Sequence, residues 1–297
     1  MSEQSSSPPK TYNLRAFFIL WIGQALSLLG SQLVQFALIW YLTRETGSGT
    51  VLALATLMGM LPMIVLGPFA GALVDRWSRR WVMFVADTVV ALATLVLALL
   101  FAANLASIPA IYAILFIRSL GGAFHRPAMT ASTTLMIPPE HLTRISGLNQ
   151  MLNGGLNIIA APLGALLVEF LAIEYILYID VVTALFAIVP LLFIAVPQPA
   201  IALEAAVGAK ALVRSVRKDF LAGFNYIWAH YGLRKIAVMA LLINFVFAPA
   251  GSLLPLLITE HYGGGAIEFG WAEAALGGGV ILGGFLLEVE MVVELNG

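Results

Sequence analysis

The sequence has no cysteine and few charged residues. Of its 297 residues, 10% are Asp, Glu, Lys or Arg, and 61% are hydrophobic. An ordinary soluble domain is about 25% charged, so this chain has too little polar surface to cover a water-soluble globule of its size. The absence of cysteine excludes disulfides, thiolate metal sites and cysteine nucleophiles. The composition argues against a soluble enzyme, a nucleic-acid binder and a disordered protein.

Signatures of enzymes and cofactor sites are also missing from the sequence. The net charge of -1 gives no sign of a polyanionic partner, and we expect the protein not to bind nucleic acid. No G-x-x-x-x-G-K-[ST] loop is present, so ATP is not expected to drive the protein. The four histidines lack metal-ligand spacing, and no serine nucleophile elbow occurs. We therefore expect a protein that is not an enzyme and that holds no metal or cofactor.

Eight long apolar stretches predict eight membrane-spanning helices. A bilayer core about 30 Å thick requires about 20 apolar residues per helix. The runs are continuous and rich in Leu, Ala and Val, without the two-residue alternation of membrane β-strands. The predicted fold class is therefore an all-α membrane protein. The stretches cover approximately residues 16–42, 51–74, 81–103, 108–128, 145–171, 175–196, 236–259 and 269–287.

The positions of Lys and Arg predict that both termini lie in the cytoplasm. With the N-terminus inside, Arg44 alone lies in an outer loop and Arg118 lies within a span, while every other base falls on the inner side. The long connection between the sixth and seventh spans is either an amphipathic helix on the membrane surface, near residues 219–231, or a simple linker. We expect four regions: a disordered tail (1–15), a six-helix half (16–196), a cytoplasmic linker (197–235) and an incomplete second half (236–297).

Three ionisable residues inside the predicted spans are candidates for proton coupling. Arg118 lies about 15 Å into the fourth span at 1.5 Å per residue, and Gly122 and His125 share its helix face. Asp180 and Asp87 lie about two turns from opposite membrane surfaces. A charge inside the membrane costs several kcal/mol and is functional by default. Arg118 and a carboxylate either line a cavity that binds substrate or protons, or form a structural ion pair.

Two polar stripes at helical spacing point to a cavity. Amides that faced lipid would lack hydrogen-bond partners, so these faces are expected to point inward. The alternative is hydrogen bonding between helices without a pore. The stripes consist of Gln24, Ser27, Ser31 and Gln35 in the first span, and of Asn149, Asn153 and Asn157 in the fifth.

The loop between the second and third spans carries a recognisable pattern. It reads Gly71-Ala-Leu-Val-Asp75-Arg76-Trp-Ser78-Arg79-Arg80. This resembles the G-x-x-x-D-R-x-G-R-R signature of the major facilitator superfamily, with Ser78 in place of the second glycine. The alternative interpretation is that the arginines of this loop only hold it on the cytoplasmic side of the membrane. The resemblance implies a conformational latch formed by this loop, with Asp75 as its acid: Gly71, Asp75, Arg76, Arg79 and Arg80.

Two further segments resemble proton-coupled antiporters of the same superfamily. They are the fourth-helix run from Arg118 to Gly122 and the fifth-helix run from Ala161 to Ala165, which includes Pro162 and Gly164. Residues 118–139 look most like the macrolide-efflux and siderophore-exporter branch. The resemblance implies alternating access, a small amphipathic drug-like substrate exported by proton antiport, and a role for Arg118 in coupling. A siderophore or lipid exporter is the alternative within transport.

The resemblance also implies twelve helices, whereas this sequence provides eight. Residues 284–288 repeat the spacing of Gly71 to Asp75, with Glu288 in the place of Asp75. The bases expected after it are absent, and the sequence ends with three acids: Glu288, Glu290 and Glu294. We therefore expect a truncated transporter, or alternatively a non-transporting membrane fragment. The sequence gives no oligomeric state.

Overall fold

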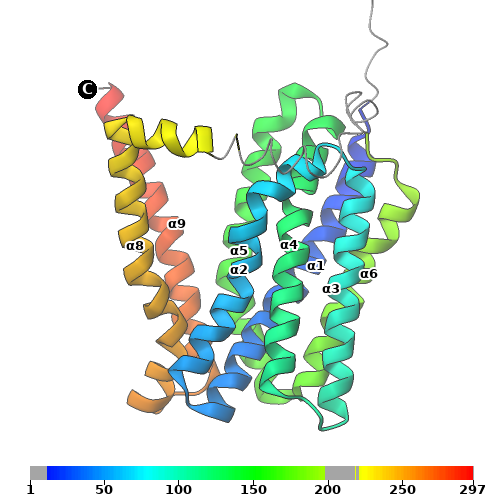
Figure 1. Ribbon diagram of the computed structural model, residues 1–297, viewed down its shortest axis with the longest axis vertical. Coiled ribbons are helices and arrows are strands. Elements are labelled where there is room, and N and C mark those ends of the chain that lie inside the picture. Colours follow the sequence, from blue (N-terminus) through cyan, green and yellow to red (C-terminus); the bar gives the residue numbers. More distant parts are fainter. Residues whose placement is uncertain (1–11, 198–217, 219–220, 297) are drawn as a thin grey trace, which may run out of the picture.

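The computed structural model describes residues 12–197, 218 and 221–296. Within these ranges the chain is helical, without strands, as the fold-class prediction requires. The helices are α1 (Leu14–Thr46), α2 (Gly49–Val74), α3 (Arg79–Ala102), α4 (Ile108–Met136), α5 (Leu142–Phe170), α6 (Ile173–Phe193), α8 (Tyr231–Leu256) and α9 (Ala266–Asn296) (Figure 1). Two short segments, η1 (Pro139–His141) and η3 (Leu257–His261), adjoin α5 and α8.

Local sequence explains where several helices begin and end. The Asn13 side chain accepts a hydrogen bond from the Ala16 amide at 3.0 Å and caps the start of α1. Gly47 ends the same helix with a φ of 53°, a left-handed conformation that glycine adopts without steric penalty. Ser107 caps α4 in the same way as Asn13 caps α1, through the Ala110 amide.

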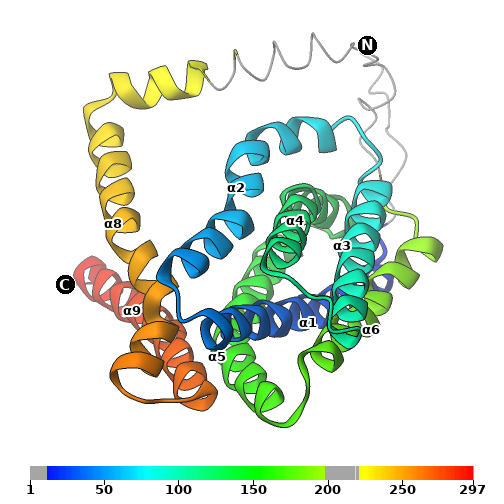
Figure 2. The same ribbon diagram turned by 60° about the horizontal axis from the view of Figure 1, so that its bottom comes forward.

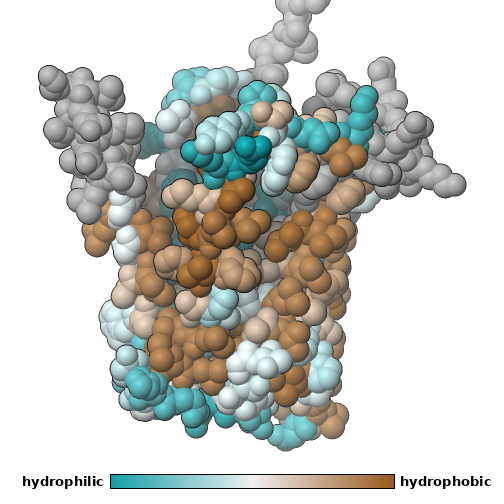
Figure 3. Space-filling model, turned by 60° about the vertical axis from the view of Figure 1, so that its left-hand side comes forward, coloured by the Kyte–Doolittle hydropathy of each residue, from teal (hydrophilic) through white to brown (hydrophobic). Residues whose placement is uncertain are grey.

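The helices match the predicted membrane spans closely. Seven of them are long and apolar enough to cross a bilayer, and they correspond to the first seven predicted stretches. The eighth stretch, 269–287, lies within α9, whose side chains are described only up to residue 283. The acidic side chains at 288, 290 and 294 therefore lie outside the described part. In Figure 3 a broad apolar band separates hydrophilic surfaces at the two ends, as expected of a protein surrounded by lipid.

Helices α1 to α6 form one packed bundle, and α8 and α9 lie along one side of it (Figures 1 and 2). In the bundle α1 packs on α6, α2 on α4, and α3 on both α4 and α6. Its largest hydrophobic cluster includes fully buried Val34, Leu38, Leu97, Ile111 and Leu177. The bundle thus has its own core, which fixes the positions of the polar side chains described below.

Helix α9 packs against α5, and α8 meets the bundle mainly at α2. At the end of the molecule remote from the C-terminus, the Phe269 ring stacks on Phe36 with centroids 5.0 Å apart and on Trp40 at 6.0 Å. Along α8, Pro255 is the buried residue. The main contact between the bundle and the last two helices is therefore the one between α5 and α9, and the aromatic rings of α1 add to it near the start of α9.

Part of the predicted amphipathic segment is helical. Residues 221–229 form a helix, visible in yellow in Figure 1, and the rings of Phe224 and Trp228 stack with centroids 5.2 Å apart. Its described side chains are all exposed. An exposed aromatic face of this kind suits a membrane surface, and that location stays a prediction.

Candidate functional site

A cavity of about 500 Å³ lies among the helices of the six-helix bundle. Its wall is mixed, with polar side chains beside apolar ones such as Met63, Leu115 and Met129. The structure brings most of the predicted polar residues to this wall: Gln24, Ser27, Ser31, Gln35, Asp87, Arg118, Asn149, Asn153 and Asp180.

One member of the predicted stripes lies elsewhere. Asn157 is absent from the cavity wall and lies where α5 meets α9. A Cβ atom added at Gly277 of α9 would come within 3.0 Å of the Asn157 carbonyl oxygen. The asparagine stripe therefore continues past the cavity into a helix-packing seam, and of its members Asn149 and Asn153 line the cavity.

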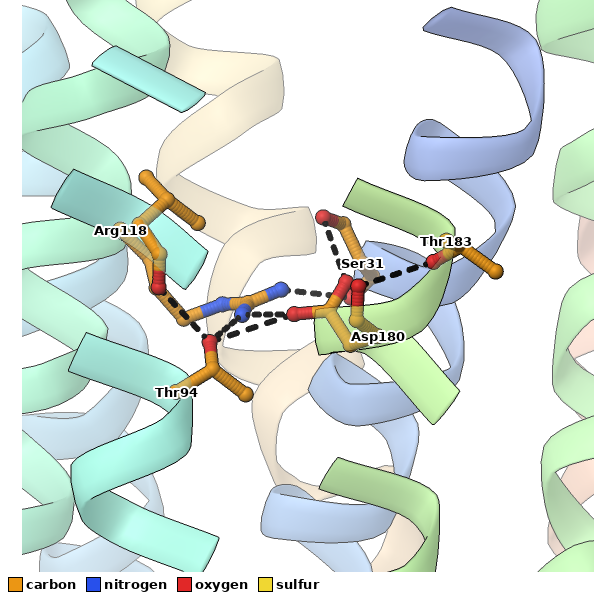
Figure 4. Close-up of polar contacts among 6 residues, drawn as sticks. Ser31, Thr94, Arg118, Asp180 and Thr183 are labelled. Atoms are coloured by element: carbon orange, nitrogen blue, oxygen red, sulfur yellow. Dashed lines mark hydrogen bonds and ion pairs between the residues drawn. The ribbon is translucent and has the colours of Figure 1, made fainter. Parts of the chain in front are cut away.

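Arg118 and Asp180 form a buried ion pair between α4 and α6. Arg118 Nη1 lies 2.5 Å from Asp180 Oδ2, and the two side chains are 9% and 2% exposed. The Ser31 hydroxyl donates to Asp180 Oδ1 at 3.2 Å, and the Thr94 hydroxyl donates to Oδ2 at 3.2 Å. Arg118 also donates to Thr94 and to the Ser31 carbonyl (Figure 4). Four helices, α1, α3, α4 and α6, thus meet at one charge pair.

The close approach of α1 and α6 depends on a glycine beside this pair. A Cβ atom added at Gly30 would lie 2.2 Å from the Thr183 hydroxyl oxygen and 3.1 Å from the Asp180 Cα atom. Because Gly30 has no side chain, α1 can bring Ser31 within reach of the Asp180 carboxylate. A charge pair at this depth needs such additional hydrogen bonds to offset the loss of hydration.

Asp87 belongs to a second polar group in the same cavity. Gln24 Nε2 donates to Asp87 Oδ2 at 2.9 Å, and His125 Nε2 lies 3.4 Å from Asp87 Oδ1. The sequence placed His125 on the same face as Arg118, and the structure shows both on the cavity wall. The pairing of His125 with Asp87 was not predicted, because helical spacing relates residues on one helix and not on two.

The loop after α2 is held to the bundle by its arginines. Arg79 is buried, and its Nη1 donates to the Ala131 carbonyl of α4 at 2.8 Å. Arg80 Nε donates to the Leu191 carbonyl at the end of α6 at 2.5 Å, and Arg80 also donates to Leu192. Arginines that bind the last carbonyls of a helix complement the negative end of its dipole.

The acid of this loop has a different environment. The Asp75 side chain is 70% exposed, and its Oδ1 lies 3.5 Å from Arg79 Nη2. Among the described residues, no atom from another helix lies within 4 Å of a Cβ atom added at Gly71, so close helix packing does not explain that glycine. Arg76 follows Asp75 directly, and its Nη1 is buried without a hydrogen-bond partner among the described residues. None of the five predicted latch residues is part of the cavity wall.

Comparison with known proteins identifies the family. Residues 20–289 match the model of the Major Facilitator Superfamily. The chain is 33% identical over 271 residues to macrolide efflux protein A of Streptococcus pyogenes, an alignment covering 91% of this chain and 65% of that protein. It is 31% identical over 241 residues to macrolide efflux protein A of Enterococcus faecalis, covering 81% and 72%. It is 29% identical over 269 residues to multidrug efflux pump Tap of Mycolicibacterium fortuitum, covering 86% and 62%.

The chain thus spans somewhat less than two thirds of the Streptococcus pyogenes protein. The matched region includes the whole cavity, its two ionisable pairs and the arginine-rich loop. With its membrane-spanning helices and these matches, the chain belongs to the Major Facilitator Superfamily of transporters.

Proposed function

We propose that this protein exports small amphipathic, macrolide-like molecules from the cell in exchange for protons. The observation that carries the proposal is the cavity of about 500 Å³ with ionisable groups inside a membrane-spanning bundle. A mixed polar and apolar wall suits ligands that are themselves amphipathic. The names of three similar proteins, two macrolide efflux proteins and a multidrug efflux pump, support export and this substrate class.

The proton part of the proposal rests on the buried charges. Arg118, Asp180 and Asp87 lie within spans, where ionisable groups mark ion and substrate pathways. The arrangement of bases around the spans supports an inner-membrane location with both termini in the cytoplasm. Alternating access of the six-helix half and the second half would move a site in the cavity between the two sides.

The test is drug accumulation in efflux-deficient bacterial cells that express this chain. We expect lower accumulation of erythromycin and of a cationic dye than in vector-only cells, and we expect an uncoupler to abolish the difference. Equal accumulation, with the protein confirmed in the membrane by immunoblot, would contradict export by this chain. Lower accumulation that persists with the uncoupler would retain export and reject the proton as its driving ion.

A second prediction concerns Asp75, for which we propose the latch role that the resemblance implies. Asp75→Asn is expected to change the free energy of unfolding by less than about 1 kcal/mol, because an exposed ion pair contributes little. The same change should slow efflux, since a latch acts on the exchange between conformations. Thermal unfolding in detergent and the initial rate of dye efflux measure the two effects separately.

Arg79→Gln provides the matched comparison within the same loop. Arg79 is buried, and its loss removes the hydrogen bond to Ala131, which is expected to cost about 1.5–3 kcal/mol. If Asp75→Asn destabilised the protein as much as Arg79→Gln, the acid would be a structural residue. Normal efflux in Asp75→Asn would leave the loop with a purely topological role.

A further inference from the structure

The cavity contains two ionisable pairs with different surroundings. The Arg118–Asp180 pair is held by Ser31 and Thr94, and Asp180 is 1% exposed. An arginine does not lose its proton in proteins. The Asp180 carboxylate is bound by a permanent cation and by two hydroxyls. This pair is therefore suited to keep its charges while other groups in the cavity gain or lose a proton.

The His125–Asp87 pair is less completely bound. Its side chains are 19% and 12% exposed, and both line the cavity. His125 Nε2 is buried and makes no hydrogen bond of ordinary geometry to the described residues, although Asp87 Oδ1 lies 3.4 Å away. Histidine is the side chain whose ordinary pKa, near 6.5, lies within the physiological range. This pair therefore combines a group that can change charge with access to the cavity.

Few other charges face this pair. Helix α3 contributes Asp87, and α6 contributes Asp180, which is already paired with Arg118. Helix α2 has no Asp, Glu, Lys, Arg or His between Gly49 and Val74, and α1 contributes the uncharged Gln24. Arg126, next to His125 on α4, also lines the cavity, and its side chain is exposed. Asp87 is thus the carboxylate in contact with His125.

We propose that His125 and Asp87 form a single exchange site that holds either a proton, on His125, or the cationic group of an amphipathic ligand, beside Asp87. When His125 is protonated, its positive charge neutralises Asp87. When a ligand cation takes its place, two positive charges would compete for one carboxylate, so the proton leaves His125 for water. The cavity keeps the same net charge in both states, and the hydrogen bond from Gln24 keeps Asp87 in position.

This inference rests on the proposed function and adds to it the charge of the ligand and the residue that binds the proton.

The probe for the test is tetraphenylphosphonium, a permanent cation that has no proton of its own to release. The full chain is purified in detergent in weakly buffered solution, and binding is followed by calorimetry and by a pH indicator dye. Between pH 6 and 8 we expect saturable binding that releases up to about one proton per cation, with the Kd falling by up to about tenfold per pH unit.

Two variants and one control locate the source of the proton. His125→Gln should bind the cation without releasing a proton and with a Kd that no longer depends on pH. Asp87→Asn should lose binding of the cation by about tenfold or more, because no carboxylate remains to attract it. His141→Gln changes an exposed histidine in η1 and should leave proton release as in the parent.

Each result decides the inference. Binding without proton release, unchanged release in His125→Gln, or absence of saturable cation binding would each overturn it. Proton-dependent efflux of erythromycin in the cell assay would still support the proposed function in any of these cases. Unfolded variants are recognised by their elution in size-exclusion chromatography, and His125→Asn then replaces His125→Gln as the test.

Discussion

Replacing Arg118 with Met is expected to destabilise the protein by about 3–5 kcal/mol, because it leaves a buried carboxylate without its counter-ion. Asp180 is 1% exposed, and Arg118 Nη1 lies 2.5 Å from its Oδ2 atom. The remaining partners of Asp180, the Ser31 and Thr94 hydroxyls, donate hydrogen bonds but carry no charge. The measurement is the unfolding transition of the detergent-purified protein, by heat and by denaturant.

The double variant Arg118→Met with Asp180→Leu separates the charge pair from its packing. Removing both charges leaves no unpaired ion, and hydrophobic replacement of a buried pair is often neutral or stabilising. We therefore expect the double variant to unfold close to the parent and well above Arg118→Met. Arg126→Met removes an exposed arginine of the same helix and should change stability by less than about 1 kcal/mol.

This pair of variants also decides between the two interpretations of Arg118 that the sequence left open. If the double variant is stable and still exports drug with proton dependence, the ion pair serves only to hold α1, α3, α4 and α6 together. If it is stable but inactive, the charges take part in transport. A single variant as stable as the parent would show that the buried pair contributes nothing to the bundle.

The position of a residue along its helix could be predicted from the sequence, whereas the contacts between helices could not. Counting residues placed Arg118, Asp87 and Asp180 inside long apolar helices, where the structure has them. Which carboxylate each base would meet depends on how the helices are arranged around the bundle. A sequence pattern with period 3.6 carries no information about that arrangement, so the pairs Arg118–Asp180 and His125–Asp87 emerged from the structure.

The polar stripes illustrate the same limit. The spacing of Gln24, Ser27, Ser31 and Gln35 correctly assigns one face of α1 to the cavity. On α5 the same reasoning placed Asn157 there too, although that position meets Gly277 of α9. Helical periodicity identifies the residues that share a face, and the neighbouring helix determines whether that face meets a cavity or a packing seam.

Glycine positions are the least predictable feature, and the largest steric effect is expected at one of them. A Cβ atom added at Gly23 would lie 2.1 Å from the Phe186 carbonyl oxygen and 2.9 Å from its carbonyl carbon. Backbone atoms of a helix cannot move aside as a flexible side chain can. Gly23→Ala is therefore expected to force α1 away from α6 and to cost about 3 kcal/mol, the upper end of the usual range for overpacking.

Gly147→Ala in α5 is the control, because Gly147 is exposed and, among the described residues that are not its chain neighbours, no atom outside its own helix backbone lies within 4 Å of the added Cβ. There, alanine should be neutral or stabilising by up to about 1 kcal/mol, since it has the higher helix propensity. Comparing the unfolding transitions of the two variants isolates the steric effect from the propensity effect. Equal stability of Gly23→Ala and Gly147→Ala would contradict the close contact between α1 and α6.

The Gly23 variant should also affect the exchange site, because the next residue on α1 is Gln24. A shift of α1 away from the bundle lengthens the 2.9 Å hydrogen bond from Gln24 Nε2 to Asp87, which makes Asp87 freer to move. We therefore expect Gly23→Ala to bind tetraphenylphosphonium more weakly than Gly147→Ala, in addition to unfolding at a lower temperature. If Gly23→Ala lowers the free energy of unfolding but leaves the Kd for the cation unchanged, the position of the Asp87 carboxylate does not depend on α1.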